Sequence, residues 1–332
     1  MTVPIPGALL ASIPSPTDGV FNIGPLAIHA YGMMIALGVV AAVWLAGRRM
    51  EKAGVGTRDD MSSIAMWAVG AGVIGARLYY IVTDKSQPWK EPGRWLKIWE
   101  GGLGIPGGLL AGVLVGAWAI KRRGLSVPGV LTAAAPAIPL AQAIGRLGNW
   151  WNQELFGRPS DLLWAVQISP TKAAAAGYPG VATFHPTFLY EMLWNLGLFA
   201  VLVLVDRRRN LRPGTLLPIY IGGYFLGRLW IEALRVDTAS IIFGLRVNIW
   251  LSILGIVGAI VAVAVRGLRH RPDDSDEPYR DGHRWVPPGD EAQAELADGT
   301  DGPGVSEVEV SEVEVSDAPG VSDGPGVPRP ST

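Results

Sequence analysis

The apolar residues of this chain gather in seven blocks, each close to the roughly 20 residues that a helix needs to cross the hydrocarbon core of a bilayer. The blocks lie near residues 28–47, 63–83, 102–120, 129–148, 187–205, 214–235 and 247–265. Only 17% of all residues are charged, which is typical of a membrane protein. We therefore predict an all-α integral membrane protein of about seven transmembrane helices, with a small external cap region and a disordered acidic C-terminal tail.

The segments outside the blocks suggest three parts. Residues 1–27 lack the features of a signal peptide and are interpreted as an external N-terminal segment. Residues 28–271 form the seven-helix transmembrane domain, with the cap region near 149–186 in the longest outer connection. Residues 272–332 hold 16 Asp and Glu against three Arg and have no helical periodicity, so we expect a disordered cytoplasmic tail.

Basic residues in the connections predict the orientation, because cytoplasmic loops of membrane proteins carry an excess of Lys and Arg. One set of alternate connections holds 14 basic residues and the other set holds seven. This bias predicts an external N-terminus and a cytoplasmic C-terminus. The outer connection 83–100 alternates basic residues with tryptophans, which suits either a short helix in the headgroup layer or a plain loop.

The chain has no cysteine, which excludes disulfides, thiolate metal sites and a cysteine nucleophile of its own. No spacing resembles a metal site, a phosphate-binding glycine loop or a Ser-His-Asp nucleophile elbow. We predict no metal and no cofactor. A nucleic-acid partner is not expected either.

Ionisable side chains within the apolar blocks are the informative residues, since each costs roughly 2.5 to 3.5 kcal/mol at the bilayer centre. Arg146 lies in the polar segment 145–157, which also holds Asn149 and Glu154 and makes a plausible anion site. The alternative interpretation is that the Arg146 side chain only extends to the membrane interface. Arg228, Glu232 and Arg235 follow at i, i+4 and i+7 on one helical face, as either an ion-pair lock or a headgroup site.

Three further residues have weaker assignments. Arg77 near the end of the second block is interpreted as a residue that extends to the membrane interface. His185 precedes a proline at the start of the fifth block and fits the beginning of a helix. His29 could lie in the headgroup layer or, given the ordinary pKa range of histidine, act as a general base.

Together these motifs resemble the prolipoprotein diacylglyceryl transferase family. The resemblance extends from His29 to Arg271 and rests most strongly on segment 145–157, joined by segments 29–32, 75–80, 185–191 and 227–237. It implies that residues 28–271 are a catalytic domain in the bacterial cytoplasmic membrane, with the active site toward the external face. Its substrates would be phosphatidylglycerol and prolipoproteins with a lipobox cysteine, joined as a thioether with release of glycerol phosphate.

The same resemblance implies site residues. Those matched as catalytic are Tyr31, Arg146, Asn149, Glu154, Arg228 and Glu232. Those expected to bind phosphatidylglycerol are Arg146, Asn149, Gly157, Arg228 and Arg235, with His29 and His185 as a possible base or support. One position departs from the family: many members have a histidine in a Gly-rich run where this chain has Pro106. Since proline cannot accept a proton, the candidate bases are Glu154, His29 and Glu232, and we favour Glu154.

Three other functions remain open from the sequence. A transporter or flippase for an anionic lipid could use the same arginines as a pathway. A phosphatidyltransferase dependent on Mg²⁺ would need a cluster of aspartates, which the apolar blocks do not offer. A membrane scaffold could recruit partners through the acidic tail.

Overall fold

The computed structural model describes residues 12–24, 26–84, Gly93, Trp95, 101–209, 211–237 and 240–268. The chain divides into two units, Met1–Trp285 and Val286–Thr332, and the second unit lies wholly outside the described residues. The predicted acidic tail and nearly all of the connection 83–100 also lie outside them. The description below therefore concerns the first unit.

Each apolar block coincides with a long helix or, in one case, with a pair of helices. In chain order the helices are α2 (Ala30–Lys52), α3 (Arg58–Thr83), α4 (Ile105–Arg122), α5 (Val127–Ala134) with α6 (Ala137–Asn152), α8 (Thr187–Arg208), α9 (Leu216–Leu234) and α10 (Val247–Arg266). Between α6 and α8 lies the short helix α7 (Pro170–Ala175). Within the described residues, three antiparallel strand pairs lie before or between the helices: β1 (Val20–Ile23) with β2 (Leu26–His29), β3 (Val166–Gln167) with β4 (Thr183–Phe184), and β5 (Ile241–Ile242) with β6 (Leu245–Arg246).

Local sequence signals explain where several helices begin and break. Thr57 and Asp60 form a capping box that starts α3, and Pro106 lies in the first turn of α4, where its missing N–H costs nothing. Pro136 separates α5 from α6, and the two helices meet at a bend of 41°. The fourth predicted span is therefore a broken one.

Among the described residues, five helices are long and apolar enough to cross a membrane, namely α2, α3, α4, α8 and α10, and the bent pair of α5 and α6 could be a sixth. Helix α9 is of similar length, but Arg228 and Glu232 lie within it and lower its mean hydropathy. The chain is a mostly helical, multi-pass membrane protein.

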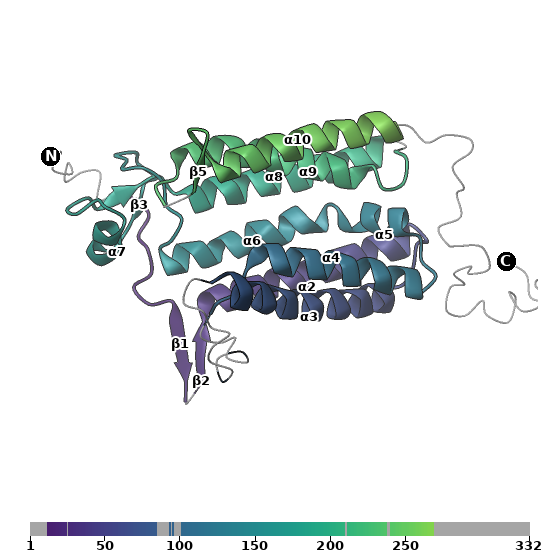
Figure 1. Ribbon diagram of the computed structural model, residues 1–332, viewed down its shortest axis with the longest axis horizontal. Helices are drawn as coiled ribbons and strands as arrows, with labels where there is room; N and C mark the ends of the chain where they lie inside the picture. Colours follow the sequence, from purple (N-terminus) through teal and green to yellow (C-terminus); the bar gives the residue numbers. More distant parts are fainter. Residues whose placement is uncertain are drawn as a thin grey trace, which may run out of the picture. The chain divides into compact units, whose positions relative to one another are not determined.

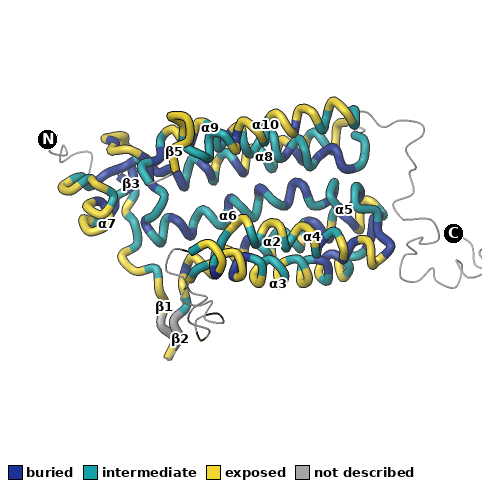
Figure 2. Tube along the Cα trace, in the orientation of Figure 1, coloured by how far each residue is buried: buried dark blue, intermediate teal, exposed yellow. Residues whose placement is uncertain are grey.

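The helices form two groups, seen one above the other in Figure 1. Helix α2 packs on α3, and α3 packs on α4, while α8, α9 and α10 pack in turn on one another. Helix α6 contacts both α2 and α8 and so joins the two groups. Figure 2 shows that the outer sides of α10, α3 and α4 carry many of the exposed residues, as expected for surfaces that face lipid. Leu109 of α4 and Leu254 of α10 are each 66% exposed.

Small residues bring α3 and α4 close together. A Cβ atom added to Gly75 would lie 2.6 Å from the carbonyl oxygen of Gly107, so only glycine allows this approach. Arg77, two residues after Gly75, does not extend to the interface as predicted. It is buried and donates to the carbonyl oxygens of Gly101 and Gly102 at 2.6 and 2.9 Å. The free carbonyls of the glycine-rich segment explain the difference, because they satisfy the guanidinium inside the protein.

A small region of β-strands and α7 lies at one end of the helices (Figure 1). Its apolar centre includes Phe156 and Phe184, whose ring centroids lie 4.7 Å apart. The N-terminal segment joins it, since the amide of Ile13 donates to the carbonyl of Ala165 at 2.7 Å. Gln153, in a left-handed conformation at the end of α6, accepts from the amide of Ser169 and donates to the carbonyl of Pro16.

Candidate active site

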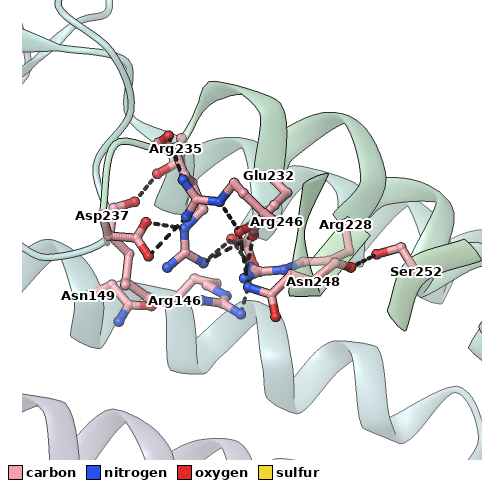
Figure 3. Close-up of polar contacts among 12 residues, drawn as sticks. Arg146, Asn149, Arg228, Glu232, Arg235, Asp237, Arg246, Asn248 and Ser252 are labelled. Atoms are coloured by element: carbon pink, nitrogen blue, oxygen red, sulfur yellow. Dashed lines mark hydrogen bonds and ion pairs between the residues drawn. The ribbon is translucent and has the colours of Figure 1, made fainter. Parts of the chain in front are cut away.

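A cluster of arginines and carboxylates lies where α6, α8, α9 and the start of α10 meet. We call it the arginine cluster; it consists of Arg146, Arg228, Arg235, Arg246, Glu191, Glu232 and Asp237. Figure 3 shows Arg146 on α6 facing the side chains of Arg228 and Glu232 across the boundary between the two helix groups. Residues that the sequence separates by about 100 positions thus form one site.

Glu191 on α8 bridges two of the arginines. Its Oε2 atom lies 2.7 Å from the guanidinium of Arg146, and its Oε1 atom accepts a hydrogen bond of 3.1 Å from Arg228. The Glu191 side chain is 5% exposed, so this charge could not remain inside the protein without both partners. The bridge therefore fixes the two guanidinium groups beside each other.

Glu232 occupies a second bridging position, one turn beyond Arg228 on α9. Its Oε2 atom lies 2.8 Å from Arg228, and its Oε1 atom accepts from Arg246 at 2.7 Å and from Asn248 at 3.0 Å. Arg235 binds Asp237 at 2.6 Å and lies 4.0 Å from both Glu191 and Glu232. The sequence left an ion-pair lock and a headgroup site as alternatives for this face of α9. The ion pairs are present, and through Glu191 they hold the side chain of Arg228 beside that of Arg146.

A chain of polar contacts leads from the cluster to the end of α6. Arg146 donates to Oδ1 of Asn149 at 3.1 Å, and Nδ2 of Asn149 donates to Oε1 of Glu154 at 2.8 Å. Asn149 is buried, whereas Glu154 is partly exposed. Tyr31 of α2 lies against Gly148 and interacts electrostatically with Glu154 and Arg146. All six residues matched as catalytic therefore lie in or beside one site.

Gly157 and His185 support this site from the cap side. A Cβ atom added to Gly157 would lie 2.7 Å from Cβ of His185 and 3.2 Å from the carbonyl oxygen of Leu234, so glycine is required for packing here. The amide of Gly157 donates to the carbonyl of His185, and Nδ1 of His185 lies 3.1 Å from the hydroxyl of Tyr190. Burial and the nearby charge of Arg158 lower the pKa of His185, which favours a neutral imidazole.

His29 has a different position from the other candidates. It is exposed at the N-cap of α2 and pairs with Val20 between strands β1 and β2. Within the described part of the chain, no hydrogen bond or ion pair joins it to the arginine cluster. Pro106, at the start of α4, has only a helix-initiating role in the structure.

Sequence reasoning missed the roles of Glu191 and Arg246. Glu191 lies within the matched segment 185–191, and a carboxylate one turn inside an apolar block needs a cationic partner. Arg246 is one of the seven basic residues in the set of connections that carries fewer of them. Its position directly before α10 was a signal, yet nothing in the sequence shows that the turn between β5 and β6 returns it to Glu232.

The cluster is suited to bind an anion. It contains four arginines and three carboxylates, so one positive charge is in excess within this set. Arg146 and Arg228 are 18% and 14% exposed, so parts of both guanidinium groups remain accessible. Planar guanidinium groups hold phosphate through paired hydrogen bonds. No group of three or more His, Asp or Glu side chains within the described residues could hold a metal ion.

Known proteins provide an independent comparison. The family model described as "Prolipoprotein diacylglyceryl transferase" matches residues 18–265. A protein named phosphatidylglycerol–prolipoprotein diacylglyceryl transferase from Frankia alni is 49% identical over 276 residues, which cover 82% of this chain and 72% of that relative. A protein of the same name from Frankia casuarinae is 50% identical, over 77% of this chain and 63% of that relative. Another from Streptomyces griseus is 44% identical, over 82% of this chain and 83% of that relative. The chain belongs to the prolipoprotein diacylglyceryl transferase family.

Proposed function

We propose that this chain transfers the diacylglyceryl group of phosphatidylglycerol to the thiol of a lipobox cysteine in prolipoproteins, with release of glycerol phosphate. Membership of the family and the names of its relatives support this function. The observation that carries it is the pair of arginines from two helix groups, Arg146 and Arg228, which one buried carboxylate, Glu191, holds side by side. Such a pair suits the phosphate of an anionic lipid headgroup.

The reaction is a displacement at the glycerol C3 carbon. A thiolate sulfur forms the new C–S bond, while the C–O bond to phosphate breaks and its electron pair stays on the phosphate oxygen. Arg146 and Arg228 offset the negative charge that grows on the leaving group, an interaction that is strong in a site sheltered from water. Since the chain has no cysteine, the sulfur belongs to the substrate.

A base must accept the proton of the thiol, whose ordinary pKa is about 8.5. We propose Glu154 for this role. It is partly exposed, and Asn149 links it to Arg146 through two hydrogen bonds. It can therefore reach a group that is bound at the arginines. Glu232 is fully buried and already contacts Arg228, Arg246 and Asn248, so its carboxylate is not accessible to a substrate thiol.

The remaining roles follow from position. We propose that Asn149 orients the lipid headgroup, that Arg235 keeps Glu191 and Glu232 in place, and that Tyr31 borders the bound substrate. His185 is assigned to support of the cap, and His29 to the headgroup layer. Gly157 allows the cap to approach α8 and α9 closely, and this packing supports its assignment to the lipid site.

We also propose the finer topology predicted from the sequence. Counting α9 and the broken pair as spans gives seven, with an external N-terminus, a cytoplasmic C-terminus and the active site toward the external face of the bacterial cytoplasmic membrane. The proposed parts are the segment 1–27, the catalytic domain 28–271 with its cap near 149–186, and the acidic tail 272–332. The position of the arginine cluster beside the cap supports this arrangement.

The decisive experiment uses the purified full-length chain in phosphatidylglycerol micelles with a synthetic lipobox peptide, followed by mass spectrometry. We expect a diacylglyceryl mass increment that disappears with Arg146→Ala and with a peptide in which serine replaces cysteine. Arg48→Ala, which removes an exposed arginine on α2, is the matched control and should retain transfer. Absence of any increment with folded wild-type protein would overturn the proposal and favour transport of an anionic lipid.

A further inference from the structure

An apolar groove of about 520 Å³ runs along the outer side of α8, where this helix packs on α9. It is lined by Tyr190, Leu193, Trp194, Gly197, Leu198 and Val201 of α8 and by Trp230 of α9. Figure 1 shows the two helices side by side in the same group. Leu193 and Val201 are 56% and 50% exposed, so the groove is open to the surroundings of the helices. Because α8 is apolar enough to cross a membrane, these surroundings are lipid.

The groove has the length of one lipid leaflet. Its lining residues on α8 repeat every three or four positions, and therefore follow one face of the helix. From Tyr190 to Val201 this face rises about 16 Å at 1.5 Å per residue. Half of a hydrocarbon core about 30 Å thick is roughly 15 Å. An extended acyl chain that begins beside Tyr190 would thus end near the middle of the bilayer, at Val201.

Trp194 lies between the groove and the arginine cluster. A second, smaller space in the structure is lined by Glu191, Arg228 and Trp194, and Trp194 also lines the groove. The indole of Trp194 donates to the carbonyl of Gly223 at 2.9 Å, and a Cβ atom on Gly227 would collide with its ring. Trp194 is therefore held flat against α9, between the charged site on one side and the apolar groove on the other.

The end of the groove beside the cap is polar. The hydroxyl of Tyr190 accepts from the indole of Trp164 at 3.1 Å and lies 3.1 Å from Nδ1 of His185. The ring of Tyr190 lies 6.1 Å from that of Trp230, and the two rings form the walls of this end. The groove thus changes from polar to apolar along its length, as a phospholipid does from its ester groups to its acyl chain.

We propose that this groove binds one fatty acyl chain of the phospholipid whose phosphate meets Arg146 and Arg228. The inference rests on the proposed function and adds to it a second contact region for the same substrate. The neighbouring site indicates the occupant. The arginine cluster lies on the other side of Trp194 and suits an anionic headgroup, so the chain that the groove holds is that of an anionic glycerophospholipid. The groove then orients the glycerol carbon relative to the arginines.

The first test fills the groove without disturbing the fold. A Cβ atom on Gly197 meets no other atom within 4 Å, so Gly197→Leu places its side chain in open groove. Gly70 of α3 is likewise an exposed helical glycine with no atom within 4 Å of its Cβ position, and Gly70→Leu controls for the gain in helix propensity. Transfer to the lipobox peptide is measured with dioleoyl- and with dihexanoyl-phosphatidylglycerol.

For Gly197→Leu we expect kcat/KM with the long-chain lipid to fall about tenfold, the range that an altered hydrophobic pocket contact produces. With the short-chain lipid it should stay within about twofold of wild type, since that lipid hardly enters the groove. Gly70→Leu should behave as wild type with both lipids. An equal loss with both lipids, or no loss with either, would overturn the acyl-chain site.

The second test does not depend on transfer. Full-length wild-type protein is irradiated with phosphatidylglycerol that carries a diazirine in one acyl chain, and the labelled peptide is identified by mass spectrometry. We expect label on 193–201, and a strong decrease in Gly197→Leu. Equal labelling by diazirine-phosphatidylcholine would show that bulk lipid occupies the groove and would refute the proposal. Selective labelling without any transfer would instead refute the proposed function and keep the lipid site.

Discussion

The two ends of α8 both carry ion pairs that join the helix groups, but the pairs differ in kind. At the end near residue 206, Arg49 of α2 binds Asp206 at 2.8 Å and donates to the carbonyl oxygens of Ala133 and Thr132 at 2.9 and 3.4 Å. These carbonyls lie at the end of α5, where the helix break leaves acceptors without helical partners. Arg49 therefore has a structural role, because it supplies hydrogen bonds to carbonyl groups at the end of α5.

At the other end, Glu191 holds two arginines with one carboxylate, and more arginines than carboxylates are present. One of these arginines, Arg246, also donates to the carbonyl oxygen of Arg235 at the end of α9, at 3.2 Å. Arg235 lies 4.0 Å from both Glu191 and Glu232, which is longer than a hydrogen bond. A lock would match its charges, whereas a binding site keeps positive charge for a ligand. This difference supports the proposal that the end near Glu191 is the functional one.

The largest expected effect is at Arg146. Arg146→Lys keeps the charge but removes the planar fork, so we expect kcat/KM to fall by about 10² to 10³ while the protein still folds. The measurement is peptide transfer at equal protein concentration in phosphatidylglycerol micelles. Turnover at the wild-type level would remove Arg146 from the phosphate site and would make the two ends of α8 equivalent.

Glu191→Gln tests the bridge itself. The variant keeps the shape of the side chain but leaves Arg146 and Arg228 without their shared counter-charge, and loss of one partner of a buried ion pair costs about 3 kcal/mol or more. We expect a lower Tm in detergent and an activity loss of about tenfold, since the two guanidinium groups then repel each other. A variant with unchanged Tm and turnover would contradict the bridging role.

Arg49→Ala should have the opposite profile. Loss of its hydrogen bonds to Ala133 and Asp206 is expected to lower stability by about 1 to 2 kcal/mol. Transfer by the folded fraction should remain within about twofold of wild type, because the helix break lies at the opposite end of α8. The comparison needs thermal unfolding and kcat/KM on the same preparation. An activity loss as large as that of Arg146→Lys would show that the ends are coupled.

The smallest effect concerns pH. Burial lowers the pKa of His185 in the folded protein from its ordinary value of 6.5, so below that value the unfolded chain binds the proton first and the folded state loses stability. Above about pH 7 both states are neutral and the effect vanishes. His185→Gln should therefore lose less Tm than wild type between about pH 7 and about pH 5. Parallel losses in both proteins would contradict a lowered pKa of His185 in the folded protein.

Helix positions were predictable because the hydrocarbon core sets the length of an apolar block. The predicted block 187–205 became Thr187–Arg208, and 247–265 became Val247–Arg266. The break between α5 and α6 was signalled by Pro136, because a proline within an apolar block favours a bend in the helix. The prediction for Arg77 was wrong for a different reason. Its partners are backbone carbonyl groups, and since every residue has one, the sequence does not show which of them an arginine will meet.

Within the site, the sequence alone showed which charged side chains have a high free-energy cost of insertion into a membrane and are therefore candidates for a function. Arg146, Arg228 and Glu232 stand out because charge inside an apolar block is expensive wherever the helix lies. Only the tertiary structure decided that Glu191 joins Arg146 to Arg228, that Arg246 returns to Glu232, and that an apolar groove begins beside them. These facts depend on how α6, α8 and α9 pack, and the sequence of one helix does not specify which face of another helix it will meet.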